Sequence, residues 1–495
     1  MEEGVLRKSK VLQVIHRLAQ NRGEEIYLVG GAVRDFWLGR PSGKDFDFVI
    51  KGEVRALAQD LAQEMGGHAF PLDEGFGSWR VVIKKAKGKI EVDLCTMQGE
   101  DILEDLRQRD FTVNSLAINL KDIFLRGHPL PIDPLGGSAD LRAGVLRANS
   151  GTSLLQDPLR MLRAFRFAYT LGLRVEEETL RMIFRNKNRI LHSAWERIRS
   201  EFFTALGEIS AHRFLRDLHQ HGLLEEIFPE VAGWEGFNQG PLHDFPLLEH
   251  ALRTVEAGEI LFTRFRELYS SFTESLGHYF SQTIEEGINR EALFKLACFF
   301  HDAGKPKTRT WDLGEKSPRF LDHDQEGEKI VAAVARRMKL SRKSIRILSE
   351  LTRHHMRILS LSKAKEVTPR AKYRFFRDLG KEGIDVALLA LADGLALRKI
   401  NFDHPSFFKD LPEDLRRVQE VAGELIRYYF EEFSQRPPTP LLDGREIMEA
   451  LGLPQGKAVG SLLARLREAE MGGVVRTREE ALDFLKSLDR SRPFG

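Results

Sequence analysis

The pattern of apolar and polar residues changes near residue 150. Before that point, short apolar runs broken by polar residues predict strands over YLVGGAV, DFDFVI, WRVVIKK, KIEVDLCT and LAINL, with a helix over ALAQDLAQEMGG. After Leu154, apolar residues recur at helical spacing, as in PLRMLRAFRFAYTLG, ETLRMIFRNKNRIL and WERIRSEFFTALGEI. We therefore predict an α+β chain in which a mixed sheet with helices is followed by an all-helical part.

Two breaks in the pattern divide the helical part. Gly240 and Pro241 interrupt it first, and Arg436-Pro437-Pro438 separates a final helical segment. A chain of 495 residues is long enough for three or more domains. We expect a sheet-containing head over 1–147, a helical neck over 148–235, a helical body over 236–435 and a helical tail over 436–495.

Composition narrows the class of protein. The 75 basic and 73 acidic residues leave a net charge of only +2, so any nucleic acid must bind a local basic patch. Cys95 and Cys298 lie in apolar runs, which argues against a disulfide framework and favours a reducing compartment. No apolar run approaches the roughly 20 residues of a membrane span, and MEEGVLRKSK lacks the apolar core of a signal peptide. We expect a cytoplasmic protein with no membrane partner.

The head carries a pair of carboxylates. Asp45 and Asp47 alternate with apolar residues in DFDFVI, so they point to the same face of a strand. Neighbouring carboxylates repel each other unless a cation lies between them, and Mg²⁺ prefers carboxylate ligands. Glu91 and Asp93 share one face of KIEVDLCT, and either could be a third acidic group. A solvated strand edge without metal is the alternative for such a short motif.

Glycine and arginine residues nearby indicate a phosphate site. Gly30 and Gly31 end one strand and open a helix, so backbone N–H groups can approach a phosphate closely. Arg34 on that helix adds a permanently charged planar donor, and Asp35 follows it. A metal site beside a triphosphate site is typical of phosphoryl or nucleotidyl transfer.

The segment RQRDFTVN extends this candidate site. Arg109 can bind triphosphate oxygens, while Asp110 or Asn114 can form a hydrogen bond with a ribose hydroxyl. The structural alternative is a charged helix end capped by Asp110.

The segment QDPLRMLRAFRFA offers groups that can read a base. We expect Asp157 and Arg160, three residues apart, to share the face of a helix that has Pro158 in its first turn. A carboxylate can accept from the exocyclic amine of cytosine or adenine while a guanidinium donates to ring acceptors. An ordinary salt bridge at a helix start is the alternative. Arg163 and Arg166 follow and complete the nucleotide-binding candidates.

The helical body contains a second group of metal-type side chains. Imidazole and carboxylate suit divalent metal ions. A single histidine is more often a surface or core residue, but adjacent His-Asp followed by Gly304-Lys305, with histidines on both sides, is a more specific pattern. The candidates are His250, His301, Asp302, His323, His354, His355 and Asp393.

Residues 27–205 resemble the head and neck of the class II tRNA nucleotidyltransferase and bacterial poly(A) polymerase family, a branch of the polymerase β-like nucleotidyltransferases. The resemblance rests on motifs in order: GGAVRD with DFD, RQRDFTVN, DPLGGSADL, QDPLR and ERIRSE. It implies that Asp45 and Asp47 hold Mg²⁺, that Arg109 and Asp110 bind triphosphate and ribose, and that Asp157 and Arg160 are the protein template for the base. This chain departs from the family's pattern at two positions, Gln108 and Gln156.

The body resembles an HD-type phosphohydrolase domain with the fuller, two-metal pattern. The implied ligands are His250, His301, Asp302, His323, His354 or His355, and Asp393, holding Mg²⁺, Mn²⁺ or Ni²⁺. Such a domain hydrolyses a phosphomonoester or a 2′,3′-cyclic phosphate, or it is retained only as a scaffold. The tail resembles the carboxy-terminal segment of family members that carry an HD domain.

The resemblance implies an enzyme that extends the 3′ end of tRNA from CTP without a nucleic-acid template. Members that add the complete C-C-A end have a long flexible loop where this chain has only MQGEDILEDL, so we expect CC addition. The alternatives are a complete CCA-adding enzyme that also uses ATP, a poly(A) polymerase, and an HD phosphohydrolase with an RNA-binding head. Oligomeric state and the RNA contacts of the tail stay open.

Overall fold

The computed structural model describes residues 5–39, 45–73, 77–85, 88–125, 130–207, 210–312, 314, 317–402, 404, 407–435, 440–471 and 473–489. The chain forms two compact units, one of Met1–Ile198 with Asp217–Ile227 and the other of Arg199–Arg216 with Phe228–Gly495. The predicted join at Arg436-Pro437-Pro438 lies outside the described residues. The four-domain division stays a prediction.

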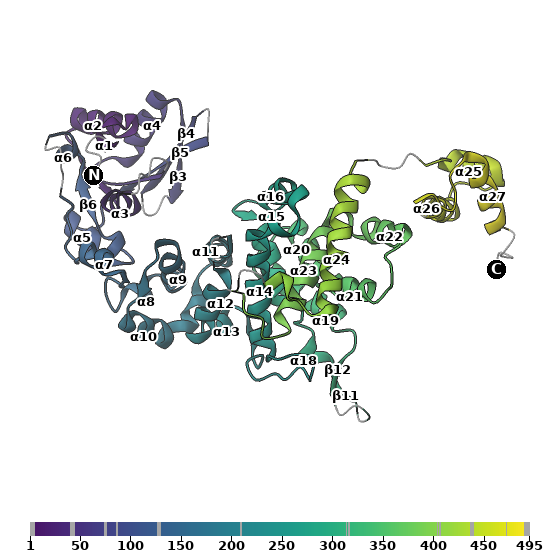
Figure 1. Cartoon of the computed structure of the whole chain (residues 1–495). Helices are drawn as coiled ribbons and strands as arrows, with labels where there is room; N and C mark the ends of the chain where they lie inside the picture. The colour runs from purple at the N-terminus through teal and green to yellow at the C-terminus, as the bar shows by residue number, and fades with distance from the viewer. Residues whose placement is uncertain are drawn as a thin grey trace. The chain divides into compact units, whose positions relative to one another are not determined.

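A six-stranded mixed sheet forms the centre of the head (Figure 1). Its order is β3-β4-β5-β2-β1-β6; the β2–β5 pair is parallel and the other pairs are antiparallel. The strands are β1 Glu25–Val29, β2 Asp45–Lys51, β3 His68–Asp73, β4 Ser78–Lys85, β5 Gly88–Thr96 and β6 Ala117–Asn119. The helices are α1 Val5–Lys8, α2 Lys10–Arg22, α3 Gly31–Trp37, α4 Val54–Met65, α5 Ile102–Gln108, η1 Thr112–Asn114, α6 Leu120–Leu125 and α7 Gly137–Ala143.

Each strand predicted in the head is present, with two differences. β1 ends at Val29 instead of continuing through the glycines, because Gly30 has a φ of +67° and α3 begins at Gly31. β3 was not predicted, because its apolar side chains Phe70 and Leu72 are exposed and show no core-facing alternation. This strand lies at the edge of the sheet, where Pro71 is tolerated because an edge strand has N–H positions that need no ladder partner.

The alternation in β2 separates the core from the acidic face. Phe46 and Phe48 are buried, whereas Asp45 and Asp47 are exposed on the opposite face. Helix α4 packs against β3, β4 and β5 through its buried apolar side. Burial of the phenylalanines thus fixes the direction in which both carboxylates point.

The segment after the head differs from the prediction at one functional position. α8 ends at Gln156 and α9 begins only at Arg160, while Asp157 between them is extended, with φ −138° and ψ 98°. The prediction that Asp157 and Arg160 share a helix face was therefore wrong. The physical reason is Pro158, because a residue that precedes proline is disfavoured in the helical region.

Short helices continue through this segment. They are α8 Ser153–Gln156, α9 Arg160–Leu171, α10 Glu177–Asn186, η2 Lys187–His192, α11 Trp195–Gly207, α12 Ala211–Gln220, α13 Leu223–Ile227 and η3 Pro229–Val231. Two very short strands, β7 Val145–Leu146 and β8 Arg174–Val175, pair in parallel.

The helical body is built around α23 Gly383–Ala396, in which every residue is buried. α14 Leu247–Thr263, α17 Arg290–Phe300 and α24 Glu413–Tyr428 pack against it. The remaining elements are α15 Phe265–Leu268, η4 Ser270–Phe272, α16 Thr273–Ser281, β9 Thr283–Glu285, β10 Ile288–Asn289, α18 Lys305–Thr308, β11 Arg309–Asp312, β12 Ser317–Phe320, α19 His323–Arg337, α20 Arg342–His354, α21 Arg357–Ser362, α22 Pro369–Leu379, η5 Gly380–Glu382, η6 Phe407–Lys409 and η7 Tyr429–Phe433.

The last helices, α25 Gly444–Leu451, α26 Lys457–Met471 and α27 Arg478–Asp489, share a small core of their own that includes Ile447, Leu466 and Leu485. Among the described residues, no helix has the length and apolarity needed to cross a membrane.

Gly304 allows the start of α18 to pack closely against the start of α19. A Cβ atom at this position would lie 2.0 Å from the carbonyl oxygen of His323, so we expect Gly304→Ala to push α19 away. Overpacking of this kind costs about 1–3 kcal/mol of unfolding free energy. The matched control is Gly277→Ala in α16, where a Cβ meets nothing within 4 Å. Thermal melting of both variants tests this: a lower melting temperature is expected only for Gly304→Ala, and an unchanged one would contradict the packing described.

Candidate transferase site and candidate metal centre

Four carboxylates lie side by side on the acidic face of the head sheet. In the register between β2 and β5, Asp45 is beside Glu91 and Asp47 is beside Asp93. The pKa of Asp47 is raised to about 6, first because the surrounding protein displaces water and next because of the negative charge of Asp93. No described residue forms a hydrogen bond or ion pair with the carboxylates of Asp45 and Asp47. This face therefore has an excess of negative charge that a cation would relieve.

Arg80 on β4 was missed by the sequence analysis. It lies across from Asp93 in the sheet register, and its Nε and Nη2 atoms donate to the two carboxylate oxygens at 2.7 and 2.8 Å. Its Nη1 atom is 3.3 Å from Glu91, which also pairs with Lys89. Both candidates for the third acidic group thus already have a cationic partner. The alternation of WRVVIKK was the signal that could have placed Arg80 on this face.

Gly30 lies where the acidic face meets the arginines. A Cβ atom at this residue would lie 3.4 Å from Oδ2 of Asp47 and 3.6 Å from Nη1 of Arg109. Arg109 itself is held by Asp105, whose Oδ2 accepts from Nε at 3.1 Å. The absence of a side chain at Gly30 leaves open the space between a carboxylate and a guanidinium, as a bound phosphate would require.

A hydrogen-bonded chain links three of the sequence motifs. Arg34 donates to Asp35 at 2.9 Å and to Oδ1 of Asn114 at 2.7 Å. The amide of Asn114 donates to Oδ1 of Asp110 at 3.2 Å, and Arg163 lies 2.8 Å from Oδ2 of Asp110. Asp110 and Asn114 are therefore inside a network and do not cap α5, whose N-cap is Asp101.

Arginine side chains also gather around Phe167, a residue that the sequence analysis did not select. The guanidinium carbons of Arg34, Arg163 and Arg166 lie 5.8, 5.3 and 4.2 Å from the centre of its ring. Cation–π contact lets several like charges approach one another. The result is a concentration of positive charge suited to an anionic ligand.

The two candidate base-reading residues are held by different partners. Oδ2 of Asp157 accepts from Arg197 at 2.7 Å, and Oδ1 accepts from the backbone N–H of Leu159 at 3.2 Å. Arg160 donates to backbone and hydroxyl oxygens of the neighbouring segments instead, so the salt bridge between Asp157 and Arg160 that the sequence offered as an alternative is absent from the described side chains. The partners of Arg160 are Gln108 O at 2.9 Å, Arg109 O at 3.3 Å, Ser153 Oγ at 3.0 Å and Ser153 O at 3.2 Å.

The predicted metal-type side chains of the body converge from separate helices. They are His250 from α14, His301 and Asp302 directly after α17, His323 from the start of α19, His355 directly after α20 and Asp393 from α23. They form two groups of potential ligands that share Asp302.

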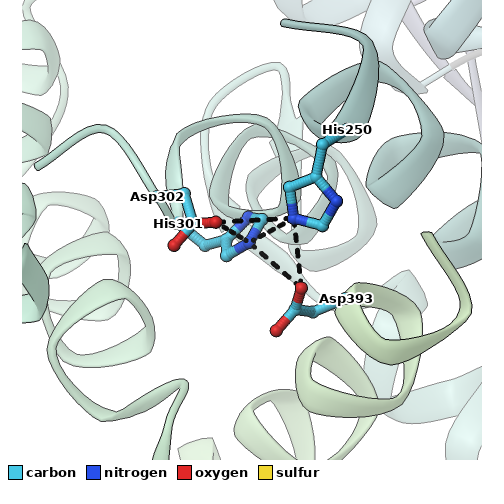
Figure 2. A group of neighbouring side chains, drawn as sticks. All are labelled: His250, His301, Asp302 and Asp393. Carbon is cyan, nitrogen blue, oxygen red and sulfur yellow. Dashed lines mark hydrogen bonds and ion pairs between the residues drawn. The ribbon is translucent and has the colours of Figure 1, made fainter. Parts of the chain in front are cut away.

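The first group consists of His250, His301, Asp302 and Asp393 (Figure 2). Nε2 of His250 lies 3.2 Å from Nε2 of His301 and 3.1 Å from Oδ1 of Asp393. Oδ2 of Asp302 lies 3.4 Å from Nε2 of His250 and 3.2 Å from Nε2 of His301. Four buried donor atoms thus face one small space.

The second group uses the other oxygen of Asp302. Oδ1 lies 3.4 Å from Nε2 of His323 and 3.6 Å from Nε2 of His355, and these two nitrogens are 3.2 Å apart. His354, which the sequence could not separate from His355, belongs to neither group. Asp302 offers one oxygen to each group and would therefore be a ligand in both.

Hydrogen bonds at the far side of the rings fix their orientation. A carbonyl oxygen can only accept a hydrogen bond, so a histidine whose Nδ1 faces a carbonyl oxygen must donate from Nδ1. When such a ring is neutral, its Nε2 atom carries a lone pair that points towards the ligand group. Such contacts join His301 to Cys298 at 2.9 Å, His323 to Phe320 at 2.8 Å and His355 to Thr352 at 2.7 Å. The imidazole lone pairs and the carboxylates of the two groups lie close together and repel one another unless a positive charge lies between them. The residues therefore fit a pair of divalent metal ions.

Lys305 supplies some of that charge. Its Nζ lies 2.5 Å from Oδ2 of Asp302 and also contacts Gln239 at 2.8 Å and His243 at 3.1 Å. Burial alone would raise the pKa of Asp302, yet the charges of His301 and Lys305 hold it well below its usual range. The site opens into a cavity of 560 Å³ whose lining includes Asp302, His323, Asp393, Lys305, Leu242, Phe320 and Met356.

Three family models match successive parts of the chain. The model described as the poly A polymerase head domain matches residues 26–147. The model described as a probable RNA and SrmB-binding site of polymerase A matches residues 172–234, and the HD domain model matches residues 247–396. The resemblance drawn from the sequence motifs is confirmed.

Relatives and a solved structure agree with these matches. An A-adding tRNA nucleotidyltransferase of Deinococcus radiodurans is 33% identical over 94% of this chain and 96% of its own length. A CC-adding tRNA nucleotidyltransferase of Geobacter sulfurreducens is 32% identical over 97% of this chain and 96% of its own length. A Thermotoga maritima CCA-adding enzyme, solved with tRNA, has the same fold with a TM-score of 0.61, at 21% identity over 98% and 97% of the two chains.

The predicted α+β fold with a polymerase-type head and an HD-type body is thus confirmed. Relatives that cover nearly the whole chain place the activity on tRNA, although their names differ in the nucleotides added. The chain belongs to the tRNA nucleotidyltransferase and poly(A) polymerase family and is a nucleotidyltransferase that acts on tRNA.

Proposed function

We propose that this enzyme adds two cytidines to the 3′ end of tRNA from CTP. The observation that carries this choice is the short connection between β5 and α5, which consists only of residues 97–101. The family resemblance implies a long flexible loop here in members that complete the C-C-A end with ATP. Complete CCA addition is the second candidate activity, and the A-adding relative makes addition of the terminal adenosine a third candidate.

Asp45 and Asp47 are the proposed Mg²⁺ ligands. Their position on one strand face, without partners among the described side chains, supports this role, as does the raised pKa of Asp47. Bound Mg²⁺ would supply positive charge to the triphosphate and favour ionisation of the attacking 3′ hydroxyl. Arg80 has a separate role, because it neutralises Glu91 and Asp93 and limits the charge of the acidic face.

The arginines and the open space at Gly30 are proposed to hold the triphosphate. Arg109 is near Gly30, while Arg34, Arg163 and Arg166 surround Phe167. These side chains orient the α-phosphate for in-line attack and bind the pyrophosphate that leaves. Asp110 and Asn114, held in their network with Arg34, are proposed to contact the ribose.

Asp157 and Arg160 are the proposed readers of the base. The carboxylate accepts from the 4-amino group of cytosine, and the guanidinium donates to the ring acceptors. Arg160 donates hydrogen bonds to the backbone carbonyl oxygens of Gln108 and Arg109, so the base-reading segment is in direct contact with the triphosphate-binding segment.

Substitution of Asp47 tests the metal assignment. We expect Asp47→Asn to reduce nucleotide transfer by about a thousandfold, because one of two metal-binding carboxylates is lost. Stability should not fall, since the substitution removes a repelling charge. Asp60→Asn on α4, where the carboxylate pairs with Arg22, is the control. Transfer at the wild-type rate by Asp47→Asn would refute the assignment.

The ends made on truncated tRNA test the nucleotide choice. One substrate ends before the C-C-A sequence and a second ends in C-C; each is incubated with CTP, with ATP and with both, and the products are sequenced. We expect two cytidines on the first substrate and no addition to the second. A terminal adenosine on either product would contradict CC addition, and long adenosine tails on a generic RNA would indicate a poly(A) polymerase.

A second activity is proposed for the body, as a phosphohydrolase dependent on a pair of divalent ions such as Mg²⁺, Mn²⁺ or Ni²⁺. The observation that favours it is the shared position of Asp302 between two ligand groups, with ring orientations fixed by carbonyl contacts. Bound metal would activate water for attack on a phosphomonoester or a 2′,3′-cyclic phosphate. Lys305 faces the cavity and can bind a phosphate oxygen.

The adjacent histidines provide a matched test of this centre. In a chain that also carries Asp45→Asn and Asp47→Asn, Mn²⁺ content is measured by mass spectrometry, so that the head does not contribute. We expect His355→Ala to lower the bound Mn²⁺ by about one ion per chain, because it removes a ligand of one group only. His354→Ala should match its parent. Equal metal content in both variants would contradict the assignment of His355 as a ligand, and a parent without metal would leave the body as a scaffold.

A further inference from the structure

We propose that Arg197 is a positioning residue for base selection, which acts by fixing the carboxylate of Asp157. The inference rests on the proposed role of Asp157 in reading cytosine. It goes beyond that role because it assigns specificity to a side chain 40 residues further along the chain, on a different helix.

The contact between the two residues is direct and charged. Nη2 of Arg197 lies 2.7 Å from Oδ2 of Asp157. Arg197 stands in the first turn of α11, whereas Asp157 lies in the extended break between α8 and α9. The carboxylate has one further described partner, the N–H of Leu159, which binds Oδ1 at 3.2 Å. Each oxygen is thus anchored once and keeps a second lone pair for a ligand.

Arg160 cannot serve as this anchor, because its guanidinium is committed elsewhere. Nη1 has three described acceptors and Nη2 has one, all of them on Ser153, Gln108 and Arg109. The Nε atom has no described acceptor and remains available to a ring oxygen or nitrogen of the base. Asp157 therefore depends on a different cation to hold its orientation.

The charge of Arg197 affects which base Asp157 can bind. The guanidinium of Arg197 donates to Oδ2 of Asp157, and an ionised carboxylate held in this way acts only as an acceptor, which suits an amino group. Cytosine presents an amino group at position 4, whereas uracil presents a carbonyl oxygen there, so Asp157 repels uracil. The Arg197 side chain is 53% exposed, so it can be changed without leaving a buried charge.

Nucleotide kinetics on the full chain test this inference. The variants are Arg197→Met, which removes the donors, and Arg197→Lys, which keeps the charge. Asp157→Asn and the double variant complete a cycle. Arg181→Met is the control, because Arg181 is an equally exposed arginine paired with Glu178 on α10. The measurements are kcat and KM for CTP and UTP on truncated tRNA, together with melting temperatures.

We expect Arg197→Met to raise KM for CTP about tenfold, the loss expected for one charge-assisted hydrogen bond, with kcat changed less than about twofold. Preference for CTP over UTP should fall in parallel, and Arg197→Lys should restore part of it. In the double variant the Arg197 change should add nothing to Asp157→Asn, because both act through one contact. Arg181→Met should behave as wild type.

The outcomes separate this inference from the function on which it rests. If Asp157→Asn leaves KM for CTP unchanged, the proposed base-reading role itself fails. If Asp157→Asn raises KM but Arg197→Met does not, or if the two effects add fully, only the role of Arg197 is overturned. A lowered melting temperature with unchanged base preference in both Arg197 variants would show a purely structural contact and would also overturn it.

Discussion

The head depends on one electrostatic constraint, the placement of four carboxylates on a single sheet face. The register that puts Asp47 beside Asp93 is fixed by the buried side chains on the opposite face, so the acidic groups cannot move apart. Arg80 forms its ion pairs with Asp93 and Glu91, and its charge offsets that of Asp47 only weakly. The remaining charge on Asp45 and Asp47 explains why the proposed site requires divalent cations, and the charge of Arg109 near Gly30 lowers the repulsion at Asp47 only in part.

The body meets a similar constraint with different ligand chemistry. The head offers only oxygen donors, which suit Mg²⁺, whereas the body combines imidazole nitrogen with carboxylate. In the body the rings are held from behind by backbone carbonyls, and Asp302 divides its oxygens between two ligand groups. The two candidate metal sites therefore differ in the ions that they should prefer, which allows them to be distinguished experimentally.

The sequence predicted features that depend on local pattern. Alternation in DFDFVI placed Asp45 and Asp47 on one face, and the His-Asp pattern identified each residue of the two ligand groups in the body. Residues that act through long-range contacts were missed. Arg80 gains its importance only when β4 lies against β5, and Arg197 only when α11 meets the break before α9. The choice between His354 and His355 likewise required the direction of each ring, which depends on where α20 ends.

The central claim is that Asp45 and Asp47 coordinate the metal ion that also binds the triphosphate. Anomalous diffraction from a crystal grown with Mn²⁺ and a non-hydrolysable CTP analogue tests it most directly, because manganese is located independently of the protein atoms. The account predicts an anomalous peak in contact with both carboxylates and with the triphosphate. An anomalous peak in the helical body alone, with the analogue bound and no manganese in contact with Asp45 or Asp47, would contradict the claim.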